Sequence, residues 1–488
     1  MRKFKKAAAW ILAVMMVMPS LAACSETPSN ETRQTAADPA ESVTPVESAA
    51  EEETTSYISD DLPEANYDGY NFNILSCYQF SKESANLMMF DEYTGDPVND
   101  VLYDSKCNIE NRFNVTVTWD SPGSKTENSA AFRNSVKAQD KSFDISIGHD
   151  IETITLTREG LCLNLKAIPQ FNMEKPWWPE NTVSVLTIGE KMYAASTYLT
   201  YLGLHWTRVL TVNKDKLENL NMKVPYDMVR EGTWTLDALH SMIEGTANDT
   251  NGNGKIDEND EVGLASGTET WYCMQAAAGI QVYKSNQDGM PELNIDIERI
   301  DKYVQIMDKI INSDDYVASG SFGIDPFSGG NATFAYTQVG DAYDYYRISD
   351  VRYGFLPTPK LDEIQENYIN CCTDMFWAMP KTLVGDEAER SAAIIEAFQC
   401  YNYNKMLPVY FEGALKARIS DSPDDAEMIQ IIADTRALSF AYTFNMPFKN
   451  IIADCVLGSA NVASYCAASE RAARKTLERL LQKFDEIE

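Results

Sequence analysis

Apolar and polar positions are patterned in short segments along the chain, and from residue 70 onward these segments predict strands and helices in alternation. Strands are expected at 70–77, 115–119 and 143–147, which are rich in apolar and β-branched residues. Between them, 99–113 and 130–141 carry apolar residues at helical spacing. A strand–helix–strand–helix–strand order predicts a parallel sheet with helices on its faces. The expected fold class is therefore α/β.

Similar patterns continue toward the C-terminus. The segment 208–214 is expected to be a strand, Thr235 is expected to cap the start of a helix, and 387–404 is expected to be a helix. The prolines in 353–360 favour an extended segment, because each disfavours helix at the residue before it. A last helix is predicted to pack on the body through one apolar face, formed by Ala473, Leu477, Leu480, Leu481 and Phe484.

Polar residues follow two of the predicted strands directly. Tyr78 and Gln79 come after the first strand, and His149 and Asp150 come after the third. Open α/β sheets bind ligands outside the carboxyl ends of their strands. These side chains are therefore candidates for a binding site at that edge.

The first 24 residues have the features of an export signal. Residues 1–23 combine a positive start, an apolar run over 7–18 and a small-residue end, and Cys24 follows directly. The run is too short for a comfortable membrane span. The sequence before Cys24 resembles the bacterial lipobox, which implies cleavage before Cys24 and attachment of lipid to its thiol. The alternative is an ordinary signal peptide with an incidental cysteine.

A polar, acidic stretch separates this signal from the patterned body. Residues 24–65 are rich in Ser, Thr, Ala, Pro and Glu and contain one basic residue, Arg33. Such a composition cannot bury enough apolar surface to offset the entropy lost on ordering, and like charges keep it extended. A disordered linker between membrane and folded domain is expected.

Length and charge narrow the classes of function. The residues after 65 are too many for one core and suit two lobes. The formal net charge is −32, which disfavours nucleic acid as a partner, because binding to its phosphates requires clustered Lys and Arg. The nine cysteines after Cys24 are scattered, odd in number and mostly within apolar runs, so buried free thiols are favoured over a disulfide framework.

The segment 249–260 closely matches a calcium-binding loop. Oxygen-bearing side chains stand at positions 1, 3, 5, 9 and 12, and Gly254 stands at position 6, where the loop turns sharply. The predicted ligands of a structural Ca²⁺ are Asp249, Asn251, Asn253, the Lys255 carbonyl, Asp257 and Asp260. Position 12 is usually Glu, so the shorter Asp260 would weaken binding unless Glu261 contributes. A plain Asn/Gly/Asp-rich turn is the alternative.

Several segments together resemble the extracellular solute-binding lipoproteins of bacterial ABC importers, in the large branch that mostly binds sugars. They lie behind the lipobox and the linker in the order FDISIGHD, GLCLNL, KPWW, IGEKMYAA, VLTVNKDKLENL, GTWTLDAL and YGFLPTPK. The resemblance extends over nearly the whole chain from residue 66. It implies a two-lobed periplasmic-binding-protein-like fold of type II with a hinge and C-terminal helices. Lobe one would comprise 66–182 plus 357–405, and lobe two 190–355 plus 406–488.

The resemblance also implies a mode of action. Such a protein is a monomer, anchored by lipid on the extracellular face of the cytoplasmic membrane, and it closes on a sugar or oligosaccharide and delivers it to an ABC permease. The residues that contact the ligand in this family do not belong to sequence motifs. The predicted contacts are therefore carried over by approximate position along the chain. The predicted ligand-binding residues are Tyr78, Gln79, Asp150, Trp206, Trp271, Tyr336, Asp374 and Trp377. Core packing of the aromatics, and capping or surface turns for the two aspartates, are the alternatives.

Other functions are disfavoured by what the sequence lacks. No nucleophile elbow, metalloprotease helix, phosphate-binding loop or dinucleotide fingerprint occurs, so an enzyme is not expected. A peptide- or other solute-binding lipoprotein of the same fold is the main alternative, and a cell-surface structural lipoprotein is a further one. A cluster of Arg or of backbone-binding Asp in the cleft would favour peptides, whereas stacked tryptophans would favour sugars.

Overall fold

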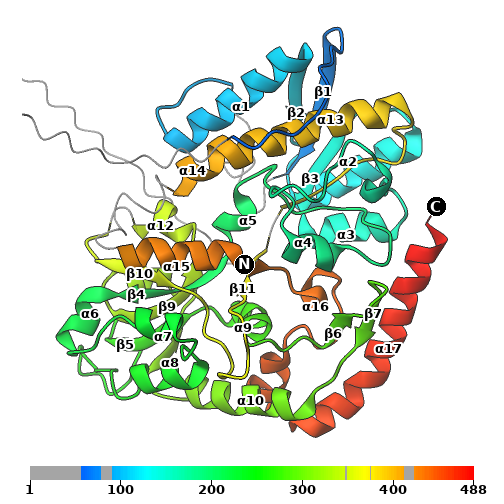
Figure 1. Ribbon diagram of the computed structural model, residues 1–488. Coiled ribbons are helices and arrows are strands. Elements are labelled where there is room, and N and C mark those ends of the chain that lie inside the picture. The colour runs from blue at the N-terminus through cyan, green and yellow to red at the C-terminus, as the bar shows by residue number, and fades with distance from the viewer. Residues whose placement is uncertain (1–56, 78–90, 347–348, 374, 412–422, 488) are drawn as a thin grey trace, which may run out of the picture. The chain divides into compact units, whose positions relative to one another are not determined.

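The computed structural model describes residues 57–77, 91–346, 349–373, 375–411 and 423–487, and Tyr57–Glu488 forms one compact unit. Two larger sheets organise it (Figure 1). The signal, the linker, Cys24, Tyr78, Gln79 and Asp374 lie outside the described residues. No described helix is long and apolar enough to cross a lipid bilayer.

The first sheet has the strand order β12-β3-β1-β2. Strands β1, β2 and β3 are parallel, as the strand–helix alternation predicted, and β12 pairs antiparallel with β3. Its strands are β1 Tyr70–Ser76, β2 Val115–Asp120, β3 Ile145–His149 and β12 Met375–Ala378. Its helices are α1 Pro97–Phe113, α2 Lys125–Ala138, α3 Asp150–Arg158, α4 Glu180–Leu186, α13 Asp386–Tyr401 and α14 Leu407–Tyr410.

Two boundaries in this sheet differ from the prediction for identifiable reasons. Helix α2 begins five residues earlier than expected, because Ser124 and Glu127 form a capping box ahead of the first apolar residues. Strand β3 begins two residues late, because the Asp144 carboxylate is buried and accepts hydrogen bonds from the Tyr70 hydroxyl and the Asn73 amide. Helices α1 and α13 lie side by side (Figure 1).

The second sheet has the order β10-β4-β9-β5-β8. Strand β5 is parallel to β8 and β9, whereas β4 is antiparallel to both β9 and β10. Its strands are β4 Arg208–Asn213, β5 Val262–Ser266, β8 Tyr316–Ala318, β9 Ala332–Gln338 and β10 Tyr353–Leu356. The helices that accompany it are α5 Leu202–His205, α6 Lys214–Asn219, α7 Tyr226–Arg230, α8 Leu236–Ile243, α9 Trp271–Ala277, α10 Ile297–Ile311, α11 Ile324–Ser328, α12 Asp341–Asp344 and α15 Pro423–Asp434.

Smaller elements join and flank the two sheets. Strand β11 Asn370–Cys371 forms a ladder of two residue pairs with β13 Arg436–Ala437, and β6 Tyr283–Ser285 pairs with β7 Pro291–Leu293. Helices α16 Phe440–Thr443 and α17 Val462–Glu486 complete the chain. The apolar face predicted for the last helix is confirmed, because Ala473, Leu477, Leu480 and Phe484 are buried. Thr235 caps α8 as predicted, by accepting a hydrogen bond from the Ala238 amide.

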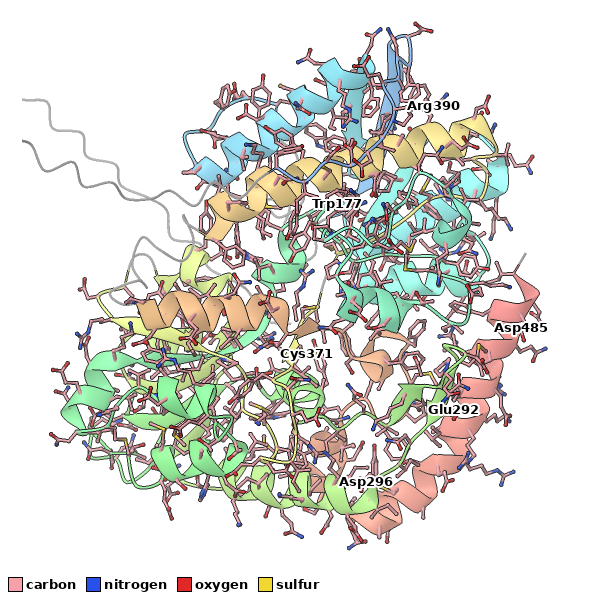
Figure 2. All side chains as sticks on the ribbon, viewed as in Figure 1. Trp177, Glu292, Asp296, Cys371, Arg390 and Asp485 are labelled. Atoms are coloured by element: carbon pink, nitrogen blue, oxygen red, sulfur yellow. The ribbon has the colours of Figure 1, made fainter. Side chains whose placement is uncertain are left out.

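The paired tryptophans of the KPWW segment are buried in the core and bind one carboxylate there. The Trp177 and Trp178 indole N–H groups donate to the two carboxylate oxygens of Glu396 on α13, at 2.9 and 3.0 Å. Trp177, labelled in Figure 2, lies beneath that helix. All nine cysteines from Cys77 onward are free thiols, and every one except Cys107 is buried, as the sequence favoured.

Candidate functional site

A pocket lies where the carboxyl edges of the two sheets meet, and we call it the interlobe pocket. It has a volume of about 390 Å³. It is lined by His149, Trp206, Arg208, Thr270, Tyr272, Phe322, Gln338, Thr373, Tyr442, Lys449 and Asn450. The pocket therefore combines aromatic rings with side chains that donate and accept hydrogen bonds.

Strand ends position most of these side chains. His149 ends β3, and Thr373 stands just before β12, whose first residue pairs with His149. In the second sheet Arg208 begins β4 and faces Gln338, the last residue of the antiparallel strand β9. Parallel strands thus deliver their last residues, and antiparallel strands their first, to one edge. The rule for open α/β sheets places a ligand at this edge.

Aromatic side chains form a flat wall in the pocket. Tyr272 of α9 stacks on Tyr442 of α16, with ring centroids 3.9 Å apart and an interplanar angle of 3°. Phe322 is 39% exposed, has a left-handed backbone with φ of 59°, and lies against Gly267, where a Cβ atom would come within 2.3 Å of its ring. A non-glycine residue in that conformation is strained, and such strain gathers at functional sites.

His149 lies at the junction of the first sheet and the pocket. Its Nδ1 is 2.9 Å from Asp150 Oδ1 and 2.8 Å from Glu152 Oε2. The same Asp150 oxygen accepts a hydrogen bond from the Ile151 amide at 2.6 Å. Asp150 is thus buried at the start of α3 close to the imidazole, and it does not itself line the pocket.

Among the described residues predicted to bind a ligand, Trp206 lines the pocket. Trp271 is fully buried and packs on the Tyr316 ring at 5.5 Å, while its neighbour Tyr272 faces the pocket. Tyr336 is also fully buried, two residues before Gln338 on the same face of β9. Trp377 is buried, and its Nε1 donates to Thr197 Oγ1 at 2.9 Å. Of these four residues, only Trp206 lines the pocket, and the ligand contacts themselves stay predictions.

Several pocket residues have no local signal in the sequence. Tyr442, Lys449 and Asn450 come from α16 and the loop after it, far along the chain from both sheets. Only folding brings them to the pocket. Arg208 could have been singled out from the sequence, because a charged residue at the start of a buried apolar strand is unusual.

Another cavity, with a volume of about 350 Å³, is lined in part by Ala276 of α9. Val282 and Tyr283 form one part of its wall and residues 437–441 another. Lys284 is the one charged side chain among its lining residues, and this cavity does not open onto the carboxyl edges of the sheets. The interlobe pocket is therefore the better candidate for the binding site.

The loop 249–260 is held by hydrogen bonds between its own side chains and backbone amides. The Asp249 carboxylate accepts hydrogen bonds from the amides of Gly252, Asn253 and Gly254 at 2.7, 3.2 and 2.7 Å. Gly254 has a φ of 79°, the left-handed conformation that position 6 requires. Side-chain oxygens of Asn251 and Asn253 each accept an amide two residues ahead.

The last position of this loop is fully buried. Asp260 accepts hydrogen bonds from the amides of Thr250, Asn251 and Asp257. Although desolvation raises its pKa, these hydrogen bonds outweigh it and lower the pKa of the carboxyl group. Glu261 turns away to pair with Lys216 at 3.0 Å.

The donor set of the loop suits a hard cation with oxygen ligands. Across the described residues, no three His, Cys, Asp or Glu side chains are grouped closely enough to hold a metal alone. A cation here would therefore use the amide oxygens of Asn251 and Asn253 and the Lys255 carbonyl along with the carboxylates.

Comparison with solved structures identifies the fold. The chain resembles the GacH receptor of Streptomyces glaucescens, solved unliganded and with acarbose, at 14% identity and a TM-score of 0.53 over 84% of this chain and 99% of that one. A cyclic α-maltosyl-1,6-maltose binding protein from Arthrobacter globiformis matches at 13% and 0.53, over 84% and 99% of the two chains. A cyclo/maltodextrin-binding protein complexed with maltotetraose matches at 13% and 0.52, over 85% and 96%.

These likenesses show the fold. The chain has the two-lobed α/β fold of periplasmic-binding-protein-like solute-binding proteins, as predicted. No model of a protein family matches the sequence, and no curated protein matches it. The lobe boundaries given above stay predictions, as do the ligand contacts.

Proposed function

We propose that the chain is the solute-binding component of an ABC importer and that it captures a sugar or oligosaccharide in the interlobe pocket. The observation that carries the proposal is the pocket itself, which lies between the carboxyl edges of two sheets in the fold of saccharide-binding proteins. Its stacked tyrosines and Phe322 offer flat apolar faces to sugar rings, and Gln338, Thr270 and Asn450 offer hydrogen bonds to hydroxyls.

The proposal includes how the protein works in the cell. Cys24 carries lipid at the extracellular face of the cytoplasmic membrane, and residues 25–65 tether the binding domain. Ligand closes the two lobes about the crossings near β11 and β13, and the closed form is recognised by a membrane permease. The protein acts as a monomer, without catalysis.

Calcium is proposed as a structural ion of the loop 249–260. Strand β5 begins directly after the loop, and the Glu258 carboxylate accepts a hydrogen bond from Ser319 Oγ, three residues before Phe322. Ca²⁺ would neutralise the loop's carboxylates and hold this side of the second sheet in place. It takes no part in contacting the ligand.

The experiment that tests the main proposal is a thermal-shift and calorimetric screen of the full chain in a mild detergent, with calcium present. Oligosaccharides, short peptides and amino acids are compared, because a ligand that binds only the folded state raises Tm. A shift with one saccharide series supports the proposal. A shift with peptides alone, or none across the panel, contradicts it.

A further inference from the structure

Arg208 brings a positive charge to the interlobe pocket and forms no salt bridge with any described carboxylate. The residue is 7% exposed, it lines the pocket, and its buried Nε has no hydrogen-bond partner in the described part of the chain. Asp341 acts on it only through its charge, while the Asp341 carboxylate accepts a hydrogen bond from the Gln338 amide. A guanidinium stays protonated in proteins, so the charge persists.

Thiols and phenols are among the groups that interact electrostatically with Arg208. They include Cys273, Tyr272 and Tyr336. Burial raises the pKa of the Cys273 thiol, but a hydrogen bond with Cys371 and the charge of Arg208 outweigh it and lower the pKa. The guanidinium thus acts on a neighbouring thiol, as a buried cation without a carboxylate partner is expected to do.

A buried cation of this kind points to an anionic partner from outside the chain. Burying an unpaired charge costs free energy that a bound oxyanion would recover. The guanidinium presents a planar fork of donors that matches a carboxylate or a sulfate with two parallel hydrogen bonds. Hydroxyl groups of a neutral sugar would leave the charge uncompensated.

A second cation lies in the same pocket. Lys449 also lines it, and no Asp or Glu is among its described lining residues, although Asp150 and Glu152 lie behind His149. This contrasts with the whole chain, which has a net charge of −32. The Tyr272–Tyr442 stack provides a flat apolar surface in the same cavity, so the pocket suits a ligand with both a ring face and a negative charge.

We infer that the ligand is an acidic saccharide and that Arg208 binds an oxyanion, a carboxylate or a sulfate, carried on one of its sugar rings. This inference rests on the proposed function and names the class of sugar. Lys449 adds a second positive charge at the exposed side of the pocket.

The first test changes only the ligand. Oligogalacturonides are compared with the same oligomers after chemical reduction of each carboxylate to a hydroxyl, by calorimetry on the full wild-type chain with calcium. Neutral oligosaccharides bearing a sulfate form a further arm, which distinguishes the two sources of oxyanion. Binding of at least one acidic series about tenfold or more tighter than its neutral counterpart is expected.

The second test changes the protein. Arg208→Gln is expected to abolish the preference for the acidic ligand, and Arg208→Lys, which keeps the charge but loses the planar fork, is expected to reduce it. Arg474→Gln, at an exposed arginine of α17, serves as the matched control and should bind as the wild type does. If Arg208→Gln does not fold, the comparison of acidic and neutral ligands on the wild type still tests whether the ligand is an acidic saccharide.

The outcomes distinguish a failure of this inference from a failure of the proposed sugar-binding function. If neutral saccharides bind as tightly as their acidic counterparts, the inference is overturned and the sugar-binding function stands. If peptides bind and no saccharide does, the function itself is overturned. A preference for the acidic form that Arg208→Gln leaves intact would also overturn the role assigned to Arg208.

Discussion

Tyr272 and Tyr442 lie face to face in the interlobe pocket, 3.9 Å apart and parallel to within 3°. One comes from α9, which follows β5 of the second sheet, and the other from α16, which contacts α3 of the first. The stack therefore joins elements associated with both sheets. It forms a rigid flat surface, because each ring restricts the other.

Replacing one ring should weaken ligand binding. Tyr442→Leu removes the stacked face, and we expect saccharide affinity to fall about tenfold, equal to about 1.4 kcal/mol. Calorimetry measures the change. Tyr442→Phe keeps the ring and serves as the control, which should bind within about twofold of the wild type. Equal affinities for all three proteins would show that the stack is not a ligand surface.

Gly267→Ala should damage the pocket while sparing the fold. The added Cβ would lie 2.3 Å from the Phe322 ring, which must move, and the ring is exposed enough to move outward. We expect several-fold weaker saccharide binding and a loss of stability of about 1 kcal/mol, the lower end of the usual cost of overpacking. Gly320→Ala is the control, because its Cβ would meet nothing within 4 Å. Unchanged binding in Gly267→Ala would remove Phe322 from the site.

Stability should depend on pH through Glu396. Burial raises the pKa of its carboxyl group from 4.5 to about 7, although the two tryptophan N–H groups oppose this rise. The folded state therefore holds a proton that the unfolded state releases between these values, so stability falls as pH rises from about 4.5 to about 7. The rise in pKa corresponds to about 3 kcal/mol.

Glu396→Gln removes this titration. We expect the free energy of unfolding, measured with denaturant at pH 5 and pH 8, to fall less steeply with pH in the variant than in the wild type. Glu389→Gln, on the same helix α13, controls for the loss of a carboxylate without burial. Identical pH profiles of wild type and Glu396→Gln would contradict the assignment.

Calcium should stabilise the folded chain through the loop 249–260. At a free concentration one hundred times its Kd, the ion adds about 2.7 kcal/mol, seen as a rise in Tm that chelation reverses. Asp249→Ala should abolish the rise. Asp288→Ala, at an exposed aspartate in the β6–β7 turn, should retain it. A calcium effect of equal size in Asp249→Ala would place the ion elsewhere.

Membrane attachment should depend on Cys24. In cells, Cys24→Ser should move the protein from the membrane fraction to the soluble exported fraction, because one thioether-linked lipid supplies the anchor. Fractionation and metabolic labelling with a fatty acid check this. Cys77→Ser, at a buried thiol after β1, is the control and should stay in the membrane fraction. An unlabelled wild-type chain would indicate an ordinary signal peptide.

The sequence predicted the elements of the fold well, because strands and helices depend on local patterns. The parallel order of β1 to β3 followed from the alternation of apolar segments, and the fold followed from the order of weak motifs along nearly the whole chain. Boundaries were less accurate where one buried polar side chain overrode the pattern, as Asp144 does before β3.

The binding site was less accessible to sequence reasoning. Trp271 and Tyr336 are fully buried, whereas Tyr272 and Gln338 on the same elements line the pocket. Which residue of a strand lies at the carboxyl edge of the sheet depends on how far the adjacent strands extend. The lengths of the adjacent strands are known only once the whole sheet is assembled. Lys449 enters only through a long-range contact that no local pattern encodes.

The buried free thiols have a kinetic consequence if the chain works outside the cytoplasm, as proposed. An unfolded copy exposes every one of the nine cysteines described here, and each can form a wrong disulfide in an oxidising environment. Folding shields all but Cys107. Disulfide formation takes seconds to hours. The chain therefore reaches its native state with free thiols only if it folds faster than its cysteines are oxidised.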